Sequence, residues 1–461
     1  MLTWFAILLP LFLFLAFYRI KILIYILIVT LTFQVSSIIN IGDYSLQIYR
    51  FLTILISIFF LIEILLKMKL KLENKIVKKI ILSGFVFSIF SILYSIVAPL
   101  IFEGYPVFPG ELGIDFSAIY GPQPLSFSKY NLAIPLFTLF YILTLFFIIT
   151  RKFSHLEIRA LNLTLKISFI IIIITSLSQV LAYYWGIFDI TKIFYTTVIR
   201  EFGYSFIGDF LPIPRVQATY YEPSMLAPFV TGIMSFYLHK AINYGKLSNY
   251  LFLFISIILI VLSTSTTAYV SALLMFSVVI LFNLPIRLRS GEILISKIKV
   301  IRYTLGIILI FLFFLFIIIF IIGLKNFLNI VDIYLINKSE SMSFKNRTIA
   351  DMHAIKLFID TYGFGVGLGS NRPSSLLPYL LSQVGFIGTI MFFLFIYNII
   401  KFSYNALKNS NYFEYFFLLP SVLISQLIAY PDITNPTLWQ FIYIVSIASI
   451  ISYRDKGVAS K

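Results

Sequence analysis

The sequence lacks cysteine altogether and carries little charge for its length. Without cysteine the chain has no disulfide framework, no thiolate nucleophile and no cysteine metal site. Charged residues make up 12% of its 461 residues, whereas a soluble globular chain carries about 25%. Roughly half of the charged surface that keeps an ordinary domain in solution is therefore missing. These absences argue against a soluble protein.

Hydrophobic residues take the place of the missing charge. They account for 60% of the chain, and the mean hydropathy is +0.99. Residues 305–323 (LGIILIFLFFLFIIIFIIG) hold no charge, and about 20 apolar residues in a helix cross a bilayer core of about 30 Å. The sequence therefore predicts an all-α, polytopic transmembrane bundle of about 12 or 13 spans, a single integral membrane domain over residues 1–461. The expected spans lie near residues 2–18, 22–39, 50–66, 80–101, 131–150, 161–185, 222–239, 249–263, 267–284, 303–324, 377–400, 413–430 and 436–452.

Basic residues outnumber acidic ones by 35 to 19, which gives a formal charge of +16. Because the basic residues lie in short loops between apolar spans, we interpret them as orienting the chain in the membrane, and we expect no nucleic-acid partner. A path of about thirteen spans puts these loops on one side, which the positive-inside rule makes cytoplasmic. The basic loops contain Arg19, Lys21, Lys67, Lys69, Lys71, Lys75, Lys78, Lys79, Arg151, Lys152, Arg159, Lys240, Lys246, Arg287, Arg289, Lys297, Lys299, Arg302, Lys401, Lys408, Arg454 and Lys456.

This topology places the N-terminus outside and the C-terminus inside a cell membrane, either plasma or inner. No cleavable signal peptide is expected, because the first residues lack a basic stretch. Three sizeable extracytoplasmic segments result, 102–130, 186–221 and 325–376. The first is rich in Gly, Pro and aromatic residues, which predicts an irregular loop over the bundle. The other two carry charges of both signs and are expected to form the active face.

The segment that ends at Pro223 carries the first candidate residues. Arg215 is expected just outside the membrane, followed by Tyr220, Tyr221 and Glu222 at the start of the next span. Pro223 suits the first turn of a helix, where amide groups are spare. A helix N-terminus beside a guanidinium is a natural anion site. The alternative is that Arg215 reaches toward lipid headgroups and that Glu222 complements the helix dipole.

Residues 341–360 (SMSFKNRTIADMHAIKLFID) predict an amphipathic helix on the outer surface, because apolar residues recur at helical spacing. Arg347 and Asp351, four residues apart, share one face of it. His353 is the one histidine expected outside, and a lone histidine on a helix is more often structural than catalytic.

A glycine-rich run follows this helix, with Gly363, Gly365, Gly367 and Gly369 at every second position before Arg372. Such a run makes a poor helix and lets the backbone approach a bound group closely. It matches neither the Walker nor the dinucleotide-binding pattern. A tight connector is the alternative interpretation.

Three guanidiniums at the outer face, those of Arg215, Arg347 and Arg372, suit a lipid-linked diphosphate. Arginine makes bidentate contacts to phosphate oxygens and stays charged at any working pH. Preorganised cations stabilise the charge that grows on a leaving diphosphate. The outer segments hold no Asp-x-Asp pair and no histidine cluster, so we expect neither a metal site nor another cofactor.

These residues resemble the O-antigen polymerase and O-antigen ligase superfamily of integral membrane glycosyltransferases. The resemblance covers Arg215 to Pro223, the polar turn at 263–267 (STSTT) with Tyr269, and most strongly Arg347 to Gly388. That last stretch has an Arg, Gly363 fifteen residues further on, the GVGLGS run, and QVGFIG at 383–388. The rest of the chain matches only as apolar spans.

The resemblance implies a transferase that uses polyprenyl-diphosphate-linked oligosaccharides, with membrane lipids, a flippase and a chain-length regulator as further partners. Arg215 and Arg347 are then the expected catalytic residues, in contact with the diphosphate or the acceptor sugar. The expected substrate-binding residues are Arg372, Gly365, Gly367, Gly369, Tyr220, Glu222 and His353.

Three functions stay open at this point. Ligases of the superfamily usually carry a His-Asn pair about a dozen residues before the glycine that matches Gly385; here that place reads Arg372-Pro373-Ser374-Ser375. This departure favours a polysaccharide polymerase over a ligase and leaves Glu222, Asp351 or His353 as candidate bases. A lipid-linked sugar flippase or transporter is the third possibility. It is disfavoured because no internal repeat is found and few charges lie within spans, Glu63 lying near the end of its own.

Overall fold

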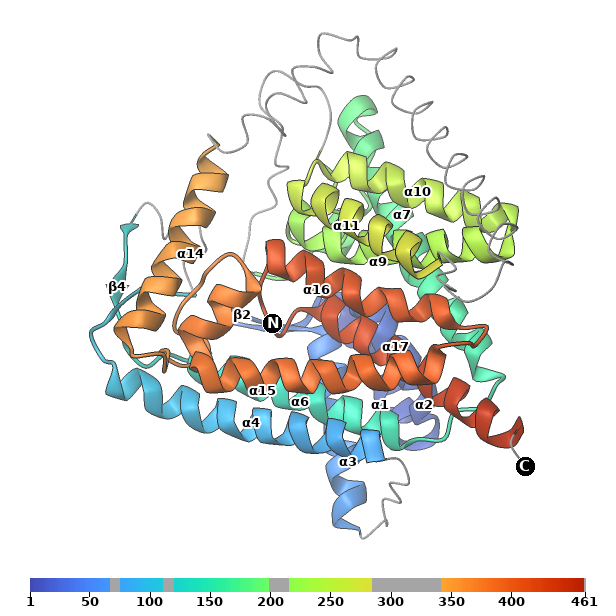
Figure 1. Cartoon of the computed structure of the whole chain (residues 1–461). Helices are drawn as coiled ribbons and strands as arrows, with labels where there is room; N and C mark the ends of the chain where they lie inside the picture. The colour runs from blue at the N-terminus through green and yellow to red at the C-terminus, as the bar shows by residue number, and fades with distance from the viewer. Residues whose placement is uncertain (67–74, 111–119, 199–214, 284–340, 460–461) are drawn as a thin grey trace, which may run out of the picture.

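The computed structural model describes residues 1–66, 75–110, 120–198, 215–283 and 341–459 (Figure 1). Within these residues, eight helices are long and apolar enough to cross a membrane. Four shorter apolar helical segments, Trp4–Tyr18, Ile20–Thr30, Leu247–Ser263 and Phe413–Ile428, accompany them. The eight long helices are α3 (Ile48–Leu65), α4 (Lys75–Ile101), α6 (Tyr130–Thr150), α7 (Glu157–Trp185), α9 (Pro223–Tyr244), α11 (Thr266–Asn283), α15 (Leu376–Leu407) and α17 (Pro436–Ala459).

The chain is therefore a mainly helical, multi-pass membrane protein, as the sequence predicted. Every expected span except 303–324 overlaps one of these helical segments. The span at 303–324 lies outside the described residues, as do parts of the three expected outer segments. The shorter elements are η1 (Trp4–Leu8), α1 (Leu9–Tyr18), α2 (Ile20–Thr30), α8 (Thr191–Phe194), α10 (Leu247–Ser263), α14 (Met342–Asp360), η5 (Phe413–Phe417) and α16 (Leu418–Ile428).

The expected span at 22–39 is the one place where the helix is clearly shorter than predicted. Helix α2 ends at Thr30, so its 11 residues rise only about 16 Å. An antiparallel hairpin follows, made of β1 (Ser37–Ile41) and β2 (Tyr44–Gln47). Ser36 and Ser37 donate hydrogen bonds to the backbone carbonyls of Phe194 and Thr196, both 2.8 Å. These polar side chains find partners in another loop, which a lipid-facing helix would not offer them.

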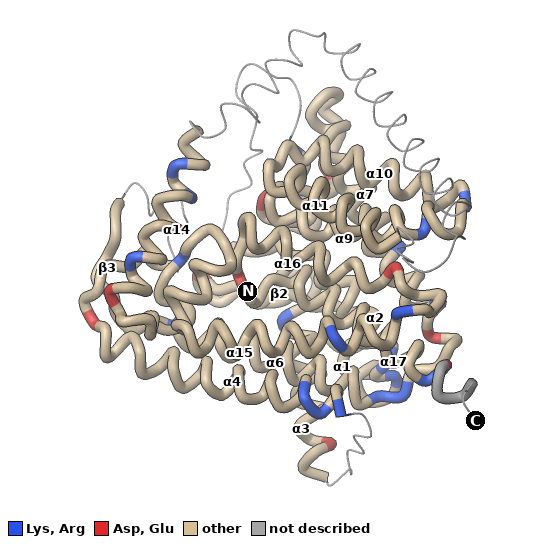
Figure 2. The backbone as a smooth tube through the Cα atoms, in the orientation of Figure 1, with Lys and Arg blue, Asp and Glu red and all other residues tan. Residues whose placement is uncertain are grey.

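Those of the predicted basic loops that the structure describes lie together at one end of the bundle, called here the basic end. Figure 2 shows Lys and Arg gathered toward the C-terminus, with a smaller group around α14 at the opposite end. Ion pairs join segments far apart in the sequence at the basic end. These pairs are Lys21–Glu157, Arg151–Glu63, His155–Asp455 and Lys240–Glu414. That this end faces the cytoplasm remains a prediction.

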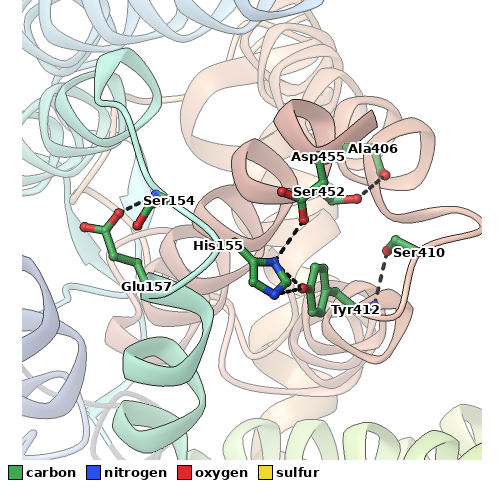
Figure 3. A network of polar contacts seen from close by, with 8 residues as sticks. All are labelled: Ser154, His155, Glu157, Ala406, Ser410, Tyr412, Ser452 and Asp455. Carbon is green, nitrogen blue, oxygen red and sulfur yellow. Dashed lines mark hydrogen bonds and ion pairs between the residues drawn. The ribbon is translucent and has the colours of Figure 1, made fainter. Parts of the chain in front are cut away.

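A histidine ties the C-terminal helix to two loops at the basic end (Figure 3). The Nδ1 atom of His155 lies 3.2 Å from the Asp455 carboxylate and 2.8 Å from the Tyr412 hydroxyl. Ser452 on the same helix donates to the backbone carbonyl of Ala406 at 2.7 Å. The contacts fix α17 against the α6–α7 loop and the end of α15.

Helix α15 is broken near its start, and the glycine-rich run fills the break. Gly385 has φ 66° and ψ −170°, which is not helical. The carbonyls of Ser382 and Gln383 accept hydrogen bonds from the backbone amides of Val366 and Gly367, at 2.9 and 2.7 Å. An unpaired carbonyl inside a membrane protein costs several kcal/mol, so the run supplies partners that the broken helix needs.

The glycines of the run leave no room for side chains. A Cβ added to Gly365 would lie 2.9 Å from the amide nitrogen of Gly385, and one added to Gly369 would lie 2.6 Å from the carbonyl oxygen of Tyr130. At Gly367 the nearest neighbour would be the ring of Pro99 at 3.0 Å. All three glycines are buried and have positive φ. The run thus packs between α4, α6 and α15.

We expect Gly385→Ala to lower the melting temperature of the detergent-solubilised protein far more than Gly186→Ala. Gly186 is in the left-handed region (φ 65°, ψ 16°), where alanine costs about 1–2 kcal/mol, whereas Gly385 (φ 66°, ψ −170°) is in a region essentially restricted to glycine and costs more. At Gly385 the new Cβ would also collide with the carbonyl oxygen of Phe364, whereas nothing lies within 4 Å at Gly186. The collision adds at least about 2 kcal/mol. Equal shifts for the two variants would contradict the packing described for the run.

Candidate functional site

The segment that carries Arg215 is held by contacts on both sides. The amide of Val216 donates to the carbonyl of Leu262 at 3.1 Å. The side-chain oxygen of Gln179 accepts from the amides of Gln217 and Ala218 at 3.1 and 3.0 Å. Ala218 has φ 52°, an uncommon conformation for a residue with a side chain. Arg215 itself is half-buried at the start of this fixed segment.

The same segment leads into α9 as the sequence predicted. Glu222 is the residue before the helix, Pro223 is its first residue, and the Ser224 hydroxyl donates to the Glu222 carboxylate at 3.3 Å. Tyr220 is fully buried, and burial raises the pKa of its hydroxyl. The Tyr221 hydroxyl accepts from the side-chain amide of Gln47 at 3.4 Å, which joins this segment to the start of α3.

The predicted amphipathic helix is present as α14, over Met342–Asp360. It stands across one end of the bundle, opposite the C-terminus (Figure 1). Asp351 accepts hydrogen bonds from the amides of Ser374 and Ser375, at 2.6 and 3.1 Å, and from the Ser375 hydroxyl at 2.7 Å. Since Ser375 precedes the first residue of α15, Asp351 caps that helix and complements its dipole. Arg347 is half-buried one turn earlier.

Arg372 lies between the glycine-rich run and α15, and its guanidinium is fixed. Its Nη1 donates to the carbonyl of Gly110 at 3.1 Å, and its backbone amide donates to the carbonyl of Phe108 at 3.0 Å. The amide of Phe108 in turn donates to the side-chain oxygen of Asn371 at 3.0 Å. One edge of the guanidinium is therefore committed to the protein, which orients the rest of the group.

His353 packs against an aromatic ring. Its imidazole packs on Phe108 with ring centroids 4.4 Å apart. It lines a small cavity of about 130 Å³ together with Pro106, Pro122, Lys356 and Asp360. Burial, and then the Lys356 ammonium, hold the pKa of His353 below its ordinary value of 6.5. The side chain thus favours its neutral form.

A cluster of charged and phenolic side chains, called here the polar cluster, lies where these segments meet. It comprises Tyr49 and Arg50 at the start of α3, Tyr221, Arg372, Tyr379 near the start of α15, and Tyr430 and Asp432 in the turn between α16 and α17. Asp432 lies close enough to interact electrostatically with Arg50, Tyr49, Tyr379 and Tyr430. Tyr430 also interacts with Arg372 and Tyr221.

Several buried polar atoms around the polar cluster have no hydrogen-bond partner among the described residues. They are the Gln47 and Gln426 side-chain oxygens, the Arg50 Nε and the Asn435 side-chain nitrogen. Buried polar groups are normally paired with protein or ordered water. Their concentration around one carboxylate and two guanidiniums is suited to a ligand that brings its own polar atoms.

The structure thus brings together some predicted residues and not others. Arg372 belongs to the polar cluster, and Tyr220 and Glu222 flank its Tyr221. Arg347 lies one turn before Asp351 on α14, and no contact between Arg347 and the cluster is found in the part of the chain that the structure describes. The glycines at 365, 367 and 369 are buried and pack closely against neighbouring chain segments, and the ring of His353 packs on Phe108. Their expected role in substrate binding stays a prediction.

Arg50 and Asp432 were missed as site residues by the sequence analysis. One signal was available for Arg50: it is a basic residue at the expected outer end of a span, where the positive-inside rule predicts few basic residues. For Asp432 no sequence pattern marked it apart from other loop acids. Its neighbours in the polar cluster come from separate parts of the chain, at residues 49–50, 221 and 372–379.

No family model matches the chain, and no curated protein sequence matches it. In the described ranges there is no group of three or more His, Cys, Asp or Glu side chains placed to hold a metal ion.

Removing the Asp351 carboxylate should destabilise the protein by about 1–2 kcal/mol, because α15 loses its N-terminal cap. The comparison is Asp351→Ala with Asp360→Ala, an exposed carboxylate at the other end of α14. Thermal unfolding of the purified protein measures both. A melting temperature for Asp351→Ala no lower than that of Asp360→Ala would contradict the capping role.

His353 should make the protein less stable as the pH falls. Because its pKa is lower in the folded state than its ordinary value of 6.5, the unfolded chain binds the proton more readily. The contribution of neutral His353 to the free energy of unfolding is therefore fully present well above pH 6.5, and it is lost as the pH falls below that value. Between about pH 7.5 and pH 5.5, we expect the melting temperature of His353→Phe to fall by less than that of the wild type. Parallel losses in the two proteins would contradict this account.

Proposed function

We propose that this chain is a membrane glycosyltransferase that polymerises polyprenyl-diphosphate-linked oligosaccharide repeats into a surface polysaccharide. The observation that carries the proposal is the polar cluster. It joins Tyr221 of the Arg215–Pro223 stretch with Arg372 of the Arg347–Gly388 stretch. These are two of the stretches in which the sequence resembles the O-antigen polymerase and ligase superfamily.

The chemistry of the residues supports the same proposal. In glycosyl transfer from a lipid diphosphate, the bond between the sugar and the diphosphate breaks and negative charge grows on the leaving phosphate oxygen. Arg372 is held in place by the carbonyl of Gly110, so its guanidinium is preorganised rather than free to relax. Arg50 supplies a second cation in the same cluster.

The location of the cluster also supports a lipid-linked substrate. It lies at the ends of α3, α15 and α17 away from the basic end. If the basic end is cytoplasmic, the cluster meets the extracytoplasmic interface of the membrane. There the diphosphate of a lipid carrier sits at the level of the headgroups while its chain stays in the bilayer. A bulky glycan then remains in water.

Arg215→Ala and Arg347→Ala should shorten the polymer made in cells and slow its extension by roughly 10²–10³-fold for a residue that contacts the transition state. Arg19→Ala is the matched control, because Arg19 is exposed at the basic end. Gel analysis of the surface polysaccharide gives the distribution of chain lengths.

Unaltered chain lengths in both variants would contradict the assignment of these arginines. A ligase is distinguished by its products, since it changes the carrier of the glycan and leaves the chain length alone. A flippase is distinguished by lipid movement in vesicles without any glycan extension. Either outcome in the wild-type protein would overturn polymerisation as the proposed function.

A further inference from the structure

The turn between α16 and α17 is held in a strained conformation. Tyr430 has φ 66°, which is rare for a bulky residue and costs of order 1–3 kcal/mol. Side chains of both flanking helices stabilise the turn: Gln426 donates to the carbonyl of Asp432 at 2.9 Å, and Trp439 donates to the carbonyl of Ile433 at 2.8 Å. A strained turn that is fixed from both sides presents its side chains in a defined direction.

The side chain that this turn presents is the carboxylate of Asp432. Its Oδ1 accepts from the amide of Thr434 at 2.7 Å and from the Thr434 hydroxyl at 2.8 Å. Its Oδ2 has no hydrogen-bond partner in the part of the chain that the structure describes. One oxygen is thus anchored, and the other remains available to a ligand.

Two guanidiniums belong to the same cluster, yet neither is paired with this carboxylate. Among the described residues, no nitrogen of Arg50 or Arg372 lies within the 4.0 Å of an ion pair with Asp432. Arg50 instead stacks over the ring of Phe137, 4.6 Å from its centroid. No direct ion pair within the described part of the chain therefore occupies the second oxygen of Asp432.

We propose that Asp432 is the base that takes the proton from the acceptor hydroxyl. This inference rests on the proposed glycosyl transfer. In the step, the acceptor O–H proton passes to Oδ2 of Asp432 as the acceptor oxygen bonds to the anomeric carbon. The bond from that carbon to the diphosphate breaks, and its electron pair leaves with the lipid diphosphate, whose charge Arg372 stabilises.

The other candidate bases are less suited to this step. Both oxygens of Asp351 are engaged in capping α15. His353 lies on α14, with its ring packed on Phe108, and is not part of the polar cluster. Glu222 accepts from the Ser224 hydroxyl at the start of α9. Asp432 differs from these three in combining one anchored oxygen with a second oxygen that has no hydrogen-bond partner in the described part of the chain.

The test compares Asp432→Asn with the wild type and with Asp360→Asn, an exposed outer carboxylate. Purified full-length protein in detergent is assayed for glycan transfer from a lipid-linked repeat, for binding of polyprenyl diphosphate without a glycan, and for melting temperature. We expect Asp432→Asn to lower kcat by at least about 100-fold, since general base catalysis contributes about 10²–10⁴-fold. Binding of polyprenyl diphosphate should stay within about threefold, because the proton acceptor does not hold the donor.

Each outcome decides between the two proposals. Transfer by Asp432→Asn at the wild-type rate would overturn the role of Asp432 and leave the proposed function standing. A wild-type protein that transfers no glycan from any lipid-linked repeat would overturn the proposed function, and this inference with it. If Asp432→Asn fails to fold, the pair Asp432→Glu and Asp432→Gln replaces it. A rate for Glu well above that for Gln supports the base, and equal rates contradict it.

Discussion

The site depends on the hydrogen bonds between the glycine-rich run and the break in α15. A transmembrane helix that unwinds exposes carbonyls that lipid cannot satisfy, and here the amides of Val366 and Gly367 pair with the carbonyls of Ser382 and Gln383. Only glycines allow the two backbones to lie so close, since a Cβ at 365 would lie 2.9 Å from the amide nitrogen of Gly385. The pairing fixes the path of the chain into Arg372 and into the first turn of α15, which Asp351 caps. The position of one site arginine therefore follows from backbone pairing.

A second constraint is electrostatic. Arg50, Arg372 and Asp432 all belong to the polar cluster at helix ends, and a buried unpaired charge is costly and is kept for a function. Neither arginine forms an ion pair among the described residues: one edge of Arg372 donates to the carbonyl of Gly110, and Arg50 stacks on the ring of Phe137. Such an arrangement stabilises a charged, polar ligand better than it stabilises the fold, because direct ion pairs would have neutralised the groups. The strained backbone at Tyr430 fits the same account.

The sequence predicted the membrane class, most helices, the surface helix α14 and the helix start at Pro223, because hydropathy, helical periodicity and proline position are local signals. The second predicted span was too long, because the hydrogen-bond partners of Ser36 and Ser37, the carbonyls of Phe194 and Thr196, lie about 160 residues further along the chain. The packing of the glycine run against α4, α6 and α15 was equally non-local. Arg50 and Asp432 were missed for that reason: neither residue has a local pattern, and only the fold brings them together.

The most direct measurement of the central claim is a cryo-EM map of the protein in lipid nanodiscs with a polyprenyl-diphosphate-linked repeat bound. The account predicts density for the diphosphate at the polar cluster, in contact with Arg372 and within reach of Arg50, with the glycan on the side away from the basic end. Density for the diphosphate at the basic end, or on the lipid-facing surface with the polar cluster unchanged, would contradict it.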